Sequence, residues 1–281
     1  MAYGLATMQR ERRLHIRRGE PIRECGLDFY PITMDHYEDF IRCKNSLTIR
    51  QSSLPVRYVS MDYLSAIFAL ELDAARNSEQ SGGIFYQLME LLFLSMRMEI
   101  DGAKLNESIH VVVEGESIKI GHIAIDQPCG DEVNHAELTP FQFSSQIRPL
   151  IAAQNQIILP DESENSDLVE AYDKKKEIQS KGLALNVDSD DLISSVSYFS
   201  GVSDREIMEW NVRDFENRRR AIDRALKYRI YSQAEMGGMV SFKHGNPYPS
   251  WCFDAIDDKL GTMAASDLEK TLSGAAAPGS T

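Results

Sequence analysis

Cysteine is scarce in this sequence, and the few cysteines follow no paired spacing. The four are Cys25, Cys43, Cys129 and Cys252. Such scattered cysteines argue against a disulfide framework or a zinc knuckle, and they are typical of reduced thiols in a cytosolic compartment. We therefore expect a cytoplasmic protein with free thiols.

Long apolar runs are also lacking. A membrane-spanning helix needs about 18 consecutive apolar residues, whereas the longest apolar stretch here, around residues 88–98, contains Glu90 and Arg97. The arginines near the N-terminus are not followed by the apolar segment of a secretory signal. The sequence predicts no association with a membrane.

Positive charge is in deficit, because 30 Lys and Arg residues face 43 Asp and Glu residues, for a net charge of −13. A strongly acidic chain is a poor match for the phosphates of nucleic acids and for anionic lipid surfaces. Net charge of this size favours solubility. Nucleic acid is therefore not an expected partner.

The sequence has no recognisable catalytic motif. It contains no G-x-x-x-x-G-K-[ST] loop, no G-x-G-x-x-G after a strand and no G-x-S-x-G elbow. One stretch that we interpret as a loop carries potential ligands without a compact zinc spacing: His122, Cys129, Asp131 and His135. We predict a protein that is not an enzyme, with no cofactor, metal site or catalytic residue.

Apolar periodicity and turn residues predict a mainly α fold with a small antiparallel β portion, an α+β protein. We divide the chain into five parts: a flexible basic arm (1–13), an N-terminal α+β domain (14–159), a charged helix or linker (160–189), a helical C-terminal domain (190–258) and a disordered tail (259–281).

In the N-terminal domain, Gly19–Glu20 and Cys25–Gly26 punctuate a short β element. Helices are expected after Thr33, after Ser60, after Gly82–Gly83 and from Thr139–Pro140 onward. The β-branched residues of 109–125 predict a hairpin around a Glu-Gly-Glu turn.

The C-terminal domain has clearer helix signals. Residues 190–199 precede Gly201, and Ser203 with Glu206 forms a capping box. Asn211 is placed to cap a long helix that ends at Gly237–Gly238.

Two C-terminal features are candidates for binding another protein. The arginines of the long helix alternate with acids, which favours a solvated, ion-paired face and leaves contact with an acidic partner as the alternative. The segment 242–254 combines two prolines with four aromatic residues, which either pack back on the protein or anchor a partner. The candidate partner-binding residues are Trp210, Phe215, Arg218, Arg219, Tyr248, Trp251 and Phe253.

The N-terminal element RGEP…GLDFYPITMDHYEDF resembles a segment of small proteins from tailed-phage and prophage tail gene clusters. In those proteins an apolar–tyrosine–proline piece leads into a helix. The portion from VSDREIMEW to SWCFD is similar to the helical end of phage tail assembly chaperones. The likeness covers roughly the first 60 residues and residues 190–255, and the middle of the chain has no counterpart.

This resemblance implies a tail assembly chaperone that works in the host cytoplasm without a cofactor. Such proteins bind the aggregation-prone tape-measure protein and help tail-tube subunits polymerise around it, and some have a frameshifted long form. Two alternatives remain: a structural tail or baseplate component of the virion, and an enzyme without a recognisable motif.

Overall fold

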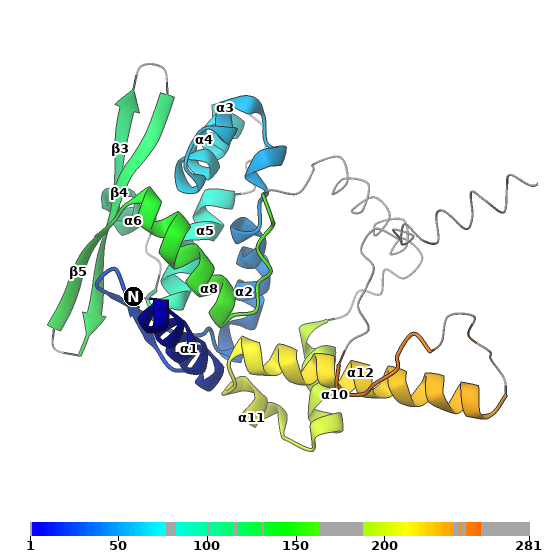
Figure 1. Ribbon diagram of the computed structural model, residues 1–281. Helices are drawn as coiled ribbons and strands as arrows, with labels where there is room; N and C mark the ends of the chain where they lie inside the picture. Colours follow the sequence, from blue (N-terminus) through cyan, green and yellow to red (C-terminus); the bar gives the residue numbers. More distant parts are fainter. Residues whose placement is uncertain are drawn as a thin grey trace, which may run out of the picture. The chain divides into compact units, whose positions relative to one another are not determined.

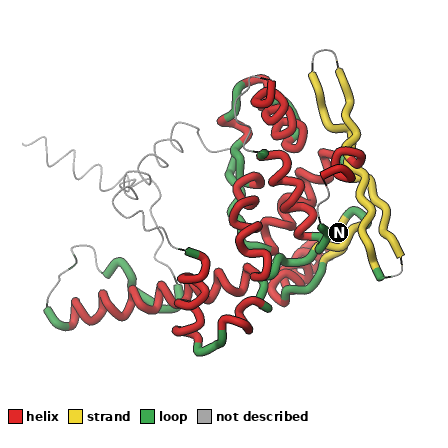
Figure 2. Tube along the Cα trace, turned by 180° about the vertical axis from the view of Figure 1, so that it is seen from behind, coloured by secondary structure: helices red, strands yellow, loops and turns green. Residues whose placement is uncertain are grey.

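The computed structural model describes residues 2–76, 83–99, 102–114, 117–130, 132–162, 188–238, 242 and 246–253. The chain divides into a first unit, residues 1–164 with 187–219, and a second unit, residues 165–186 with 220–281. The predicted fold class is confirmed, since the described residues are mainly helical and their strands form two small antiparallel sheets (Figure 1, Figure 2).

Helices make up most of the first unit. They are α1 (Ala2–Arg18), α2 (Tyr37–Cys43), α3 (Val56–Val59), α4 (Tyr63–Arg76), α5 (Ile84–Ser95), α6 (Gly102–Ser108), α7 (Pro140–Gln142), α8 (Arg148–Gln154), α10 (Ser189–Ser200) and α11 (Asp204–Met208). Short 3-10 turns are η1 (Met34–His36), η2 (Lys44–Leu47) and η3 (Gln51–Ser53), and η4 (Phe143–Ile147) is a π-helical turn. Helix α12 (Val212–Met236) begins in the first unit and continues into the second.

Several predicted helix ends are confirmed by their caps. The predicted capping box at Ser203 is present. The helix predicted from Thr139–Pro140 is present too, with Pro140 in its first turn and, in addition, a capping box at Thr139. The side chain of Asn211 accepts a hydrogen bond from the N–H of Asp214 at 2.8 Å, at the start of α12. Asp62, rather than the predicted Ser60, caps α4 by accepting from the N–H of Ser65 at 2.8 Å.

The prediction of a flexible arm over residues 1–13 is wrong for its described part, because residues 2–13 belong to α1. The segment is rich in strong helix formers such as Ala, Leu, Met, Gln and Arg. Tertiary contacts add to this propensity: the guanidinium of Arg12 lies 3.2 Å from the carboxylate of Glu24, in the first β-strand. The arginines that suggested a loose basic arm are therefore the polar side of a docked helix.

Two antiparallel sheets complete the first unit. Strands β1 (Ile22–Glu24) and β2 (Leu27–Phe29) form the predicted short hairpin, whose turn has Cys25 and Gly26 at positive φ. Strands β3 (Ile109–Glu114) and β4 (Ser117–Cys129) form the predicted hairpin, and β5 (Glu132–Leu138) adds a third strand. The prediction of a loop around residues 122–135 is therefore wrong. The segment belongs to the β4–β5 hairpin, and its polar residues obscured the alternation that indicates a strand.

The core of the first unit lies around α5, most of which is buried. Helix α4 packs against β4, where the N–H of Ile120 donates to Oγ of Ser65 at 3.0 Å. In both views the three-stranded sheet stands at one side of these helices, with β4 between β3 and α4 (Figure 1, Figure 2).

Buried amide side chains hold strand β2 and the extended segment that follows it, which includes the tyrosine–proline piece of the sequence. Gln127 accepts from the N–H of Asp28 at 2.8 Å and donates to its carbonyl at 2.7 Å. Asn155 accepts from the N–H of Ile32 at 2.9 Å. Because buried backbone groups need partners, these amides fix the path of the segment through the core.

The predicted boundary of the C-terminal domain is wrong, since residues 190–219 belong to the first unit. The carbonyl of Trp210 accepts from the N–H of Met34 at 2.9 Å, and the N–H of Val212 donates to the carbonyl of Ile32 at 2.8 Å. These long-range bonds join α11 and the start of α12 to the N-terminal segment. Residues 163–187 of the predicted linker, and the predicted tail 259–281, lie outside the described residues.

Candidate functional site

Phe215, predicted as a partner-binding residue, is a core residue instead. Its side chain is fully buried in the first unit, and its ring packs edge-on against Tyr37 with centroids 5.5 Å apart. Burial raises the pKa of Tyr37 to about 12, and its hydroxyl donates to Glu216 at 3.2 Å. The apolar side of the first turn of α12 faces the core, so Phe215 is not available to a partner.

The other candidates of the first unit lie at its surface and are already engaged. Arg218 stacks on the indole of Trp210, with its guanidinium carbon 4.0 Å from the ring centroid. Arg219 donates to Glu216 at 2.7 Å. This pattern matches the solvated, ion-paired face that the alternating charges favour, and it leaves Trp210 half-buried beneath an arginine.

The second unit contains the remaining candidates, in a segment that we call the aromatic strap and define as Phe242 with residues 246–253. Two of its rings pack on Tyr231 of α12: Phe242 with centroids 5.7 Å apart, and Tyr248 at 4.8 Å. The ammonium of Lys227 lies 5.5 Å from the centroid of Tyr248. The expectation of self-packing thus describes Tyr248 and Phe242.

Hydrogen bonds also hold the strap. Arg224 of α12 donates to the carbonyl of Cys252 at 2.9 Å. Within the strap, the side chain of Asn246 accepts from the N–H of Tyr248 at 2.8 Å, and Ser250 accepts from the N–H of Cys252 at 3.1 Å. These side-chain turns give the strap a defined backbone.

Trp251 and Phe253 remain exposed although the strap is held. Their exposed fractions are 65% and 57%. Each of the two interpretations of the aromatic residues thus describes one pair. Phe242 and Tyr248 pack on α12, whereas Trp251 and Phe253 are exposed to solvent.

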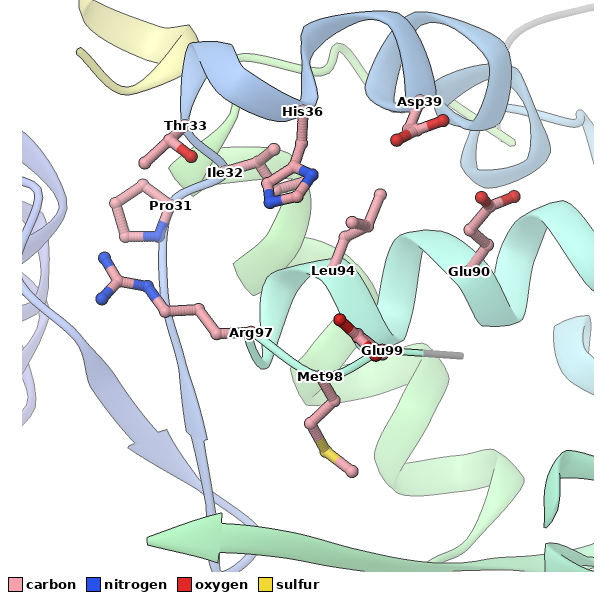
Figure 3. A pocket seen from close by; sticks show the side chains of 10 residues that line it. All are labelled: Pro31, Ile32, Thr33, His36, Asp39, Glu90, Leu94, Arg97, Met98 and Glu99. Atoms are coloured by element: carbon pink, nitrogen blue, oxygen red, sulfur yellow. The ribbon is translucent and has the colours of Figure 1, made fainter. Parts of the chain in front are cut away.

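The first unit also contains a pocket that the sequence did not reveal, with a volume of about 710 Å³. Its lining residues come from the segment after β2 with η1, from α2, and from α5 with the residues that follow it: Pro31, Ile32, Thr33, His36, Asp39, Glu90, Leu94, Arg97, Met98 and Glu99. Figure 3 shows Asp39 and Glu90 pointing toward each other from facing helices, with apolar side chains between them and Arg97.

The acidic side of this pocket is held by internal partners. Arg42 donates to Asp39 at 2.8 Å and also to Glu90. The thiol of Cys43 donates to the second oxygen of Glu90 at 3.2 Å. Burial, followed by this hydrogen bond, raises the pKa of Cys43 to about 12. Both oxygens of Glu90 are thus occupied, which suits a structural role better than proton transfer.

Of the potential metal ligands that the sequence shows between residues 122 and 135, Asp131 lies outside the described residues. His135 pairs with Asp126 across β4 and β5 at 2.6 Å, and this hydrogen bond raises the pKa of His135. Across the described ranges, no group of three or more His, Cys, Asp or Glu side chains is arranged to hold a metal ion. Nor does any helix within those ranges combine the length and apolar character that a membrane crossing requires.

Sequence reasoning missed the pocket because its lining residues come from separate segments and share no periodicity. Pro31 of the Tyr30–Pro31 pair is one of these lining residues, but a single proline after a tyrosine does not predict a pocket. Comparisons of the chain with protein-family models, with curated proteins and with solved structures found no match.

Proposed function

We propose that the protein is a non-catalytic assembly factor, a phage tail assembly chaperone that binds the tape-measure protein and assists tail-tube assembly in the host cytoplasm. The observation that carries its binding role is the exposed pair Trp251 and Phe253 on a strap that is otherwise fastened to α12. The tail-assembly part of the proposal rests on the resemblance of the N-terminal and C-terminal segments to such proteins.

A fastened strap is a suitable support for partner anchors. Large aromatic side chains dominate the energy of many protein interfaces, and they lose little conformational entropy on binding. Pro247 and Pro249 restrict the backbone beside Trp251, and the contacts with Tyr231 restrict it further. The entropy lost when a partner docks is therefore already reduced in the free protein.

The charge of the chain fits a role in keeping an aggregation-prone partner in solution. A net charge of −13 gives a complex the like-charge repulsion that opposes aggregation. The anchors themselves are uncharged, so apolar contact and charge repulsion can operate on different surfaces.

Co-expression with the tape-measure gene of the same phage, followed by affinity capture, tests the proposal. The unchanged protein should retain the tape-measure protein, and a Trp251→Ala/Phe253→Ala double variant should retain at least tenfold less, with an unchanged melting temperature. A matched control is Tyr198→Ala/Phe199→Ala, which removes another exposed aromatic pair, 82% and 51% exposed, from α10 of the first unit.

Each result of this experiment has a defined meaning. Failure of the unchanged protein to capture the tape-measure protein contradicts the chaperone proposal. Capture that is lost only in the α10 control would move the binding surface to the first unit. A large fall in the melting temperature of the strap variant would show that its aromatic residues serve stability.

A structural component of the virion is the second candidate, because an exposed aromatic pair fits a permanent interface equally well. Purified phage particles separate the two: a chaperone is absent from them, whereas a tail or baseplate subunit is present in fixed stoichiometry. The pocket beside Glu90 is the observation that favours an enzyme, but the occupied carboxylates described above weaken that alternative.

A further inference from the structure

Strand β3 has an apolar edge that is open among the described residues. It pairs with β4 and with no other described strand. Three consecutive valines on it are exposed: Val111 by 42%, Val112 by 45% and Val113 by 69%. Open strand edges of this kind template pairing with another strand.

The other edges of the same sheet are protected. In the N-terminal half of β4, helix α4 covers the strand, and the N–H of Ile120 donates to Oγ of Ser65 at 3.0 Å. Strand β5 carries exposed charged residues, among them Glu132 and Glu137, and Arg23 of β1 donates to its Asn134 at 3.2 Å. Charge and coverage are the usual protection of edges. Among the described residues, β3 has no Asp, Glu, Lys or Arg between residues 109 and 113 and no strand on its outer edge.

An irregularity in this hairpin leaves β3 itself continuous. The pairing passes from His110↔His122 to Val111↔Ile120, so Gly121 is the extra residue of a bulge in β4. A Cβ at Gly121 would stand 2.8 Å from the side chain of Val112, which explains the glycine. Because the bulge lies in β4, β3 keeps an uninterrupted run of strand residues at its edge.

The residues of β3 are complementary to themselves in one antiparallel register. With Val112 on a two-fold axis, Val111 lies opposite Val113 of a second copy, and His110 lies opposite Glu114. Facing β-branched residues are favourable cross-strand neighbours. The register pairs residues 110–114, five of the six residues of the strand.

We propose that β3 is a self-association edge, on which two copies of this chain pair antiparallel about Val112 to form a continuous six-stranded sheet. The helices of both copies then lie on the same side of that sheet. The two β4 strands stand three strand spacings apart, about 14 Å, which exceeds the distance of about 10 Å between packed helices. The α4 helices that cover β4 in each copy can therefore lie side by side without overlap.

The charge of the chain makes this association dependent on salt. Each copy carries −13, so two copies repel one another, and added salt screens that repulsion. Because the seam itself is mainly apolar, its own attraction is little affected by moderate salt. The fraction of dimer should therefore rise between low and physiological ionic strength.

Cysteine cross-linking of the full-length chain tests both the pairing and its register. The exposed Cys129 and Cys252 are first replaced by serine. Directly opposite residues of antiparallel strands have Cα atoms about 4.5–5.5 Å apart, within disulfide range. Val112→Cys should give a disulfide-linked dimer under mild oxidation, and the unsubstituted background should not.

The neighbouring positions supply the register control. In the proposed pairing, position 111 is about 8 Å from its own copy, beyond disulfide range. Val111→Cys alone and Val113→Cys alone should therefore stay monomeric on oxidation, whereas an equimolar mixture of the two should cross-link. Equal cross-linking at all three positions, or none at position 112, overturns the proposal.

A charge substitution tests the dimer without oxidation. Val112→Glu places like charges opposite each other on the two-fold axis, and light scattering should fall from twice the 31.7 kDa chain mass to a single chain. An unchanged melting temperature of the monomer shows that the substitution has not unfolded the hairpin. The proposal is overturned if the unsubstituted protein is monomeric at physiological salt. It is also overturned if the Val112→Cys variant is monomeric and its thiol does not react with maleimide, because the chain itself would then cover this edge.

Discussion

The two units use aromatic residues of the C-terminal region in opposite ways. In the first unit, Phe215 is fully buried against Tyr37 at the start of α12. In the second unit, no described residue from 220 onward is buried, and two rings of the strap, Phe242 and Tyr248, pack on Tyr231 at the surface of α12 instead. Stability is therefore concentrated in the first unit, and the second unit presents side chains that remain available.

The largest expected effect is that of removing the buried ring. Phe215→Ala should lower the free energy of unfolding of the first unit by about 3–5 kcal/mol, because it leaves a cavity in the core. The protein has two tryptophans, Trp210 in the first unit and Trp251 in the second. Urea unfolding of a Trp251→Phe background, followed by fluorescence, reports the first unit through Trp210.

The matched control is Ile230→Ala, on the same helix but in the second unit, where the side chain is 61% exposed. A surface substitution of this kind should change the free energy of unfolding by no more than about 0.5 kcal/mol. Equal losses for the two variants would erase the difference between the units.

The sequence predicted most of the local structure because local signals decide it. The capping box at Ser203, the helix start at Thr139–Pro140 and the stop at Gly201 need only neighbouring residues, and all are present. The β1–β2 turn is local in the same way. Elements of this kind are predictable from the chemistry of a few adjacent side chains.

The missed features depend on contacts between distant segments. Helix α1 is docked by contacts such as Arg12 with Glu24, β5 hides apolar positions between charged ones, and the domain boundary depends on bonds from Ile32 and Met34 to residues near 211. Phe215, Ile222 and Ile230 recur at helical spacing along α12. Periodicity alone could not show that Phe215 is buried in the core whereas Ile230 is exposed.

The candidate site was predicted in part. Residue type identified the aromatic strap, since dense aromatic residues among prolines stand out in any sequence. The division between packed Tyr248 and exposed Trp251 depends on where Tyr231 lies along α12, which composition does not encode. The pocket beside Glu90 had no comparable signal.

A smaller effect comes from pH, and it should fall on the first unit. Burial raises the pKa of Cys43 to about 12, above an unfolded value of about 8.5. The stabilising contribution is complete below about 8.5 and is lost as the pH rises, because the unfolded chain ionises first. We expect a loss on the order of 1 kcal/mol over the first pH unit above 8.5.

Urea unfolding at a series of pH values up to about 9.5, where an ordinary tyrosine hydroxyl is still mostly neutral, measures this loss. Cys43→Ala should flatten the dependence in that window while lowering stability at neutral pH. A dependence that survives in the alanine variant would assign the alkaline sensitivity to another group.

The smallest expected effect is the release of the strap. Tyr231→Ala removes the ring on which Phe242 and Tyr248 pack, and each such aromatic pair contributes about 0.5–1.5 kcal/mol. Because these contacts are exposed, we expect the lower end of this range, a roughly two- to fivefold increase in the fraction of molecules whose strap is detached from α12.

Thermolysin cleavage within residues 242–253 should accelerate by that factor, while the unfolding of the first unit stays unchanged. Tyr231→Phe keeps the ring and should behave as the unchanged protein. If Tyr231→Ala instead destabilised the first unit, the strap would be part of the same core as Phe215. The second unit would then not be a separate region whose side chains stay at the surface for a partner.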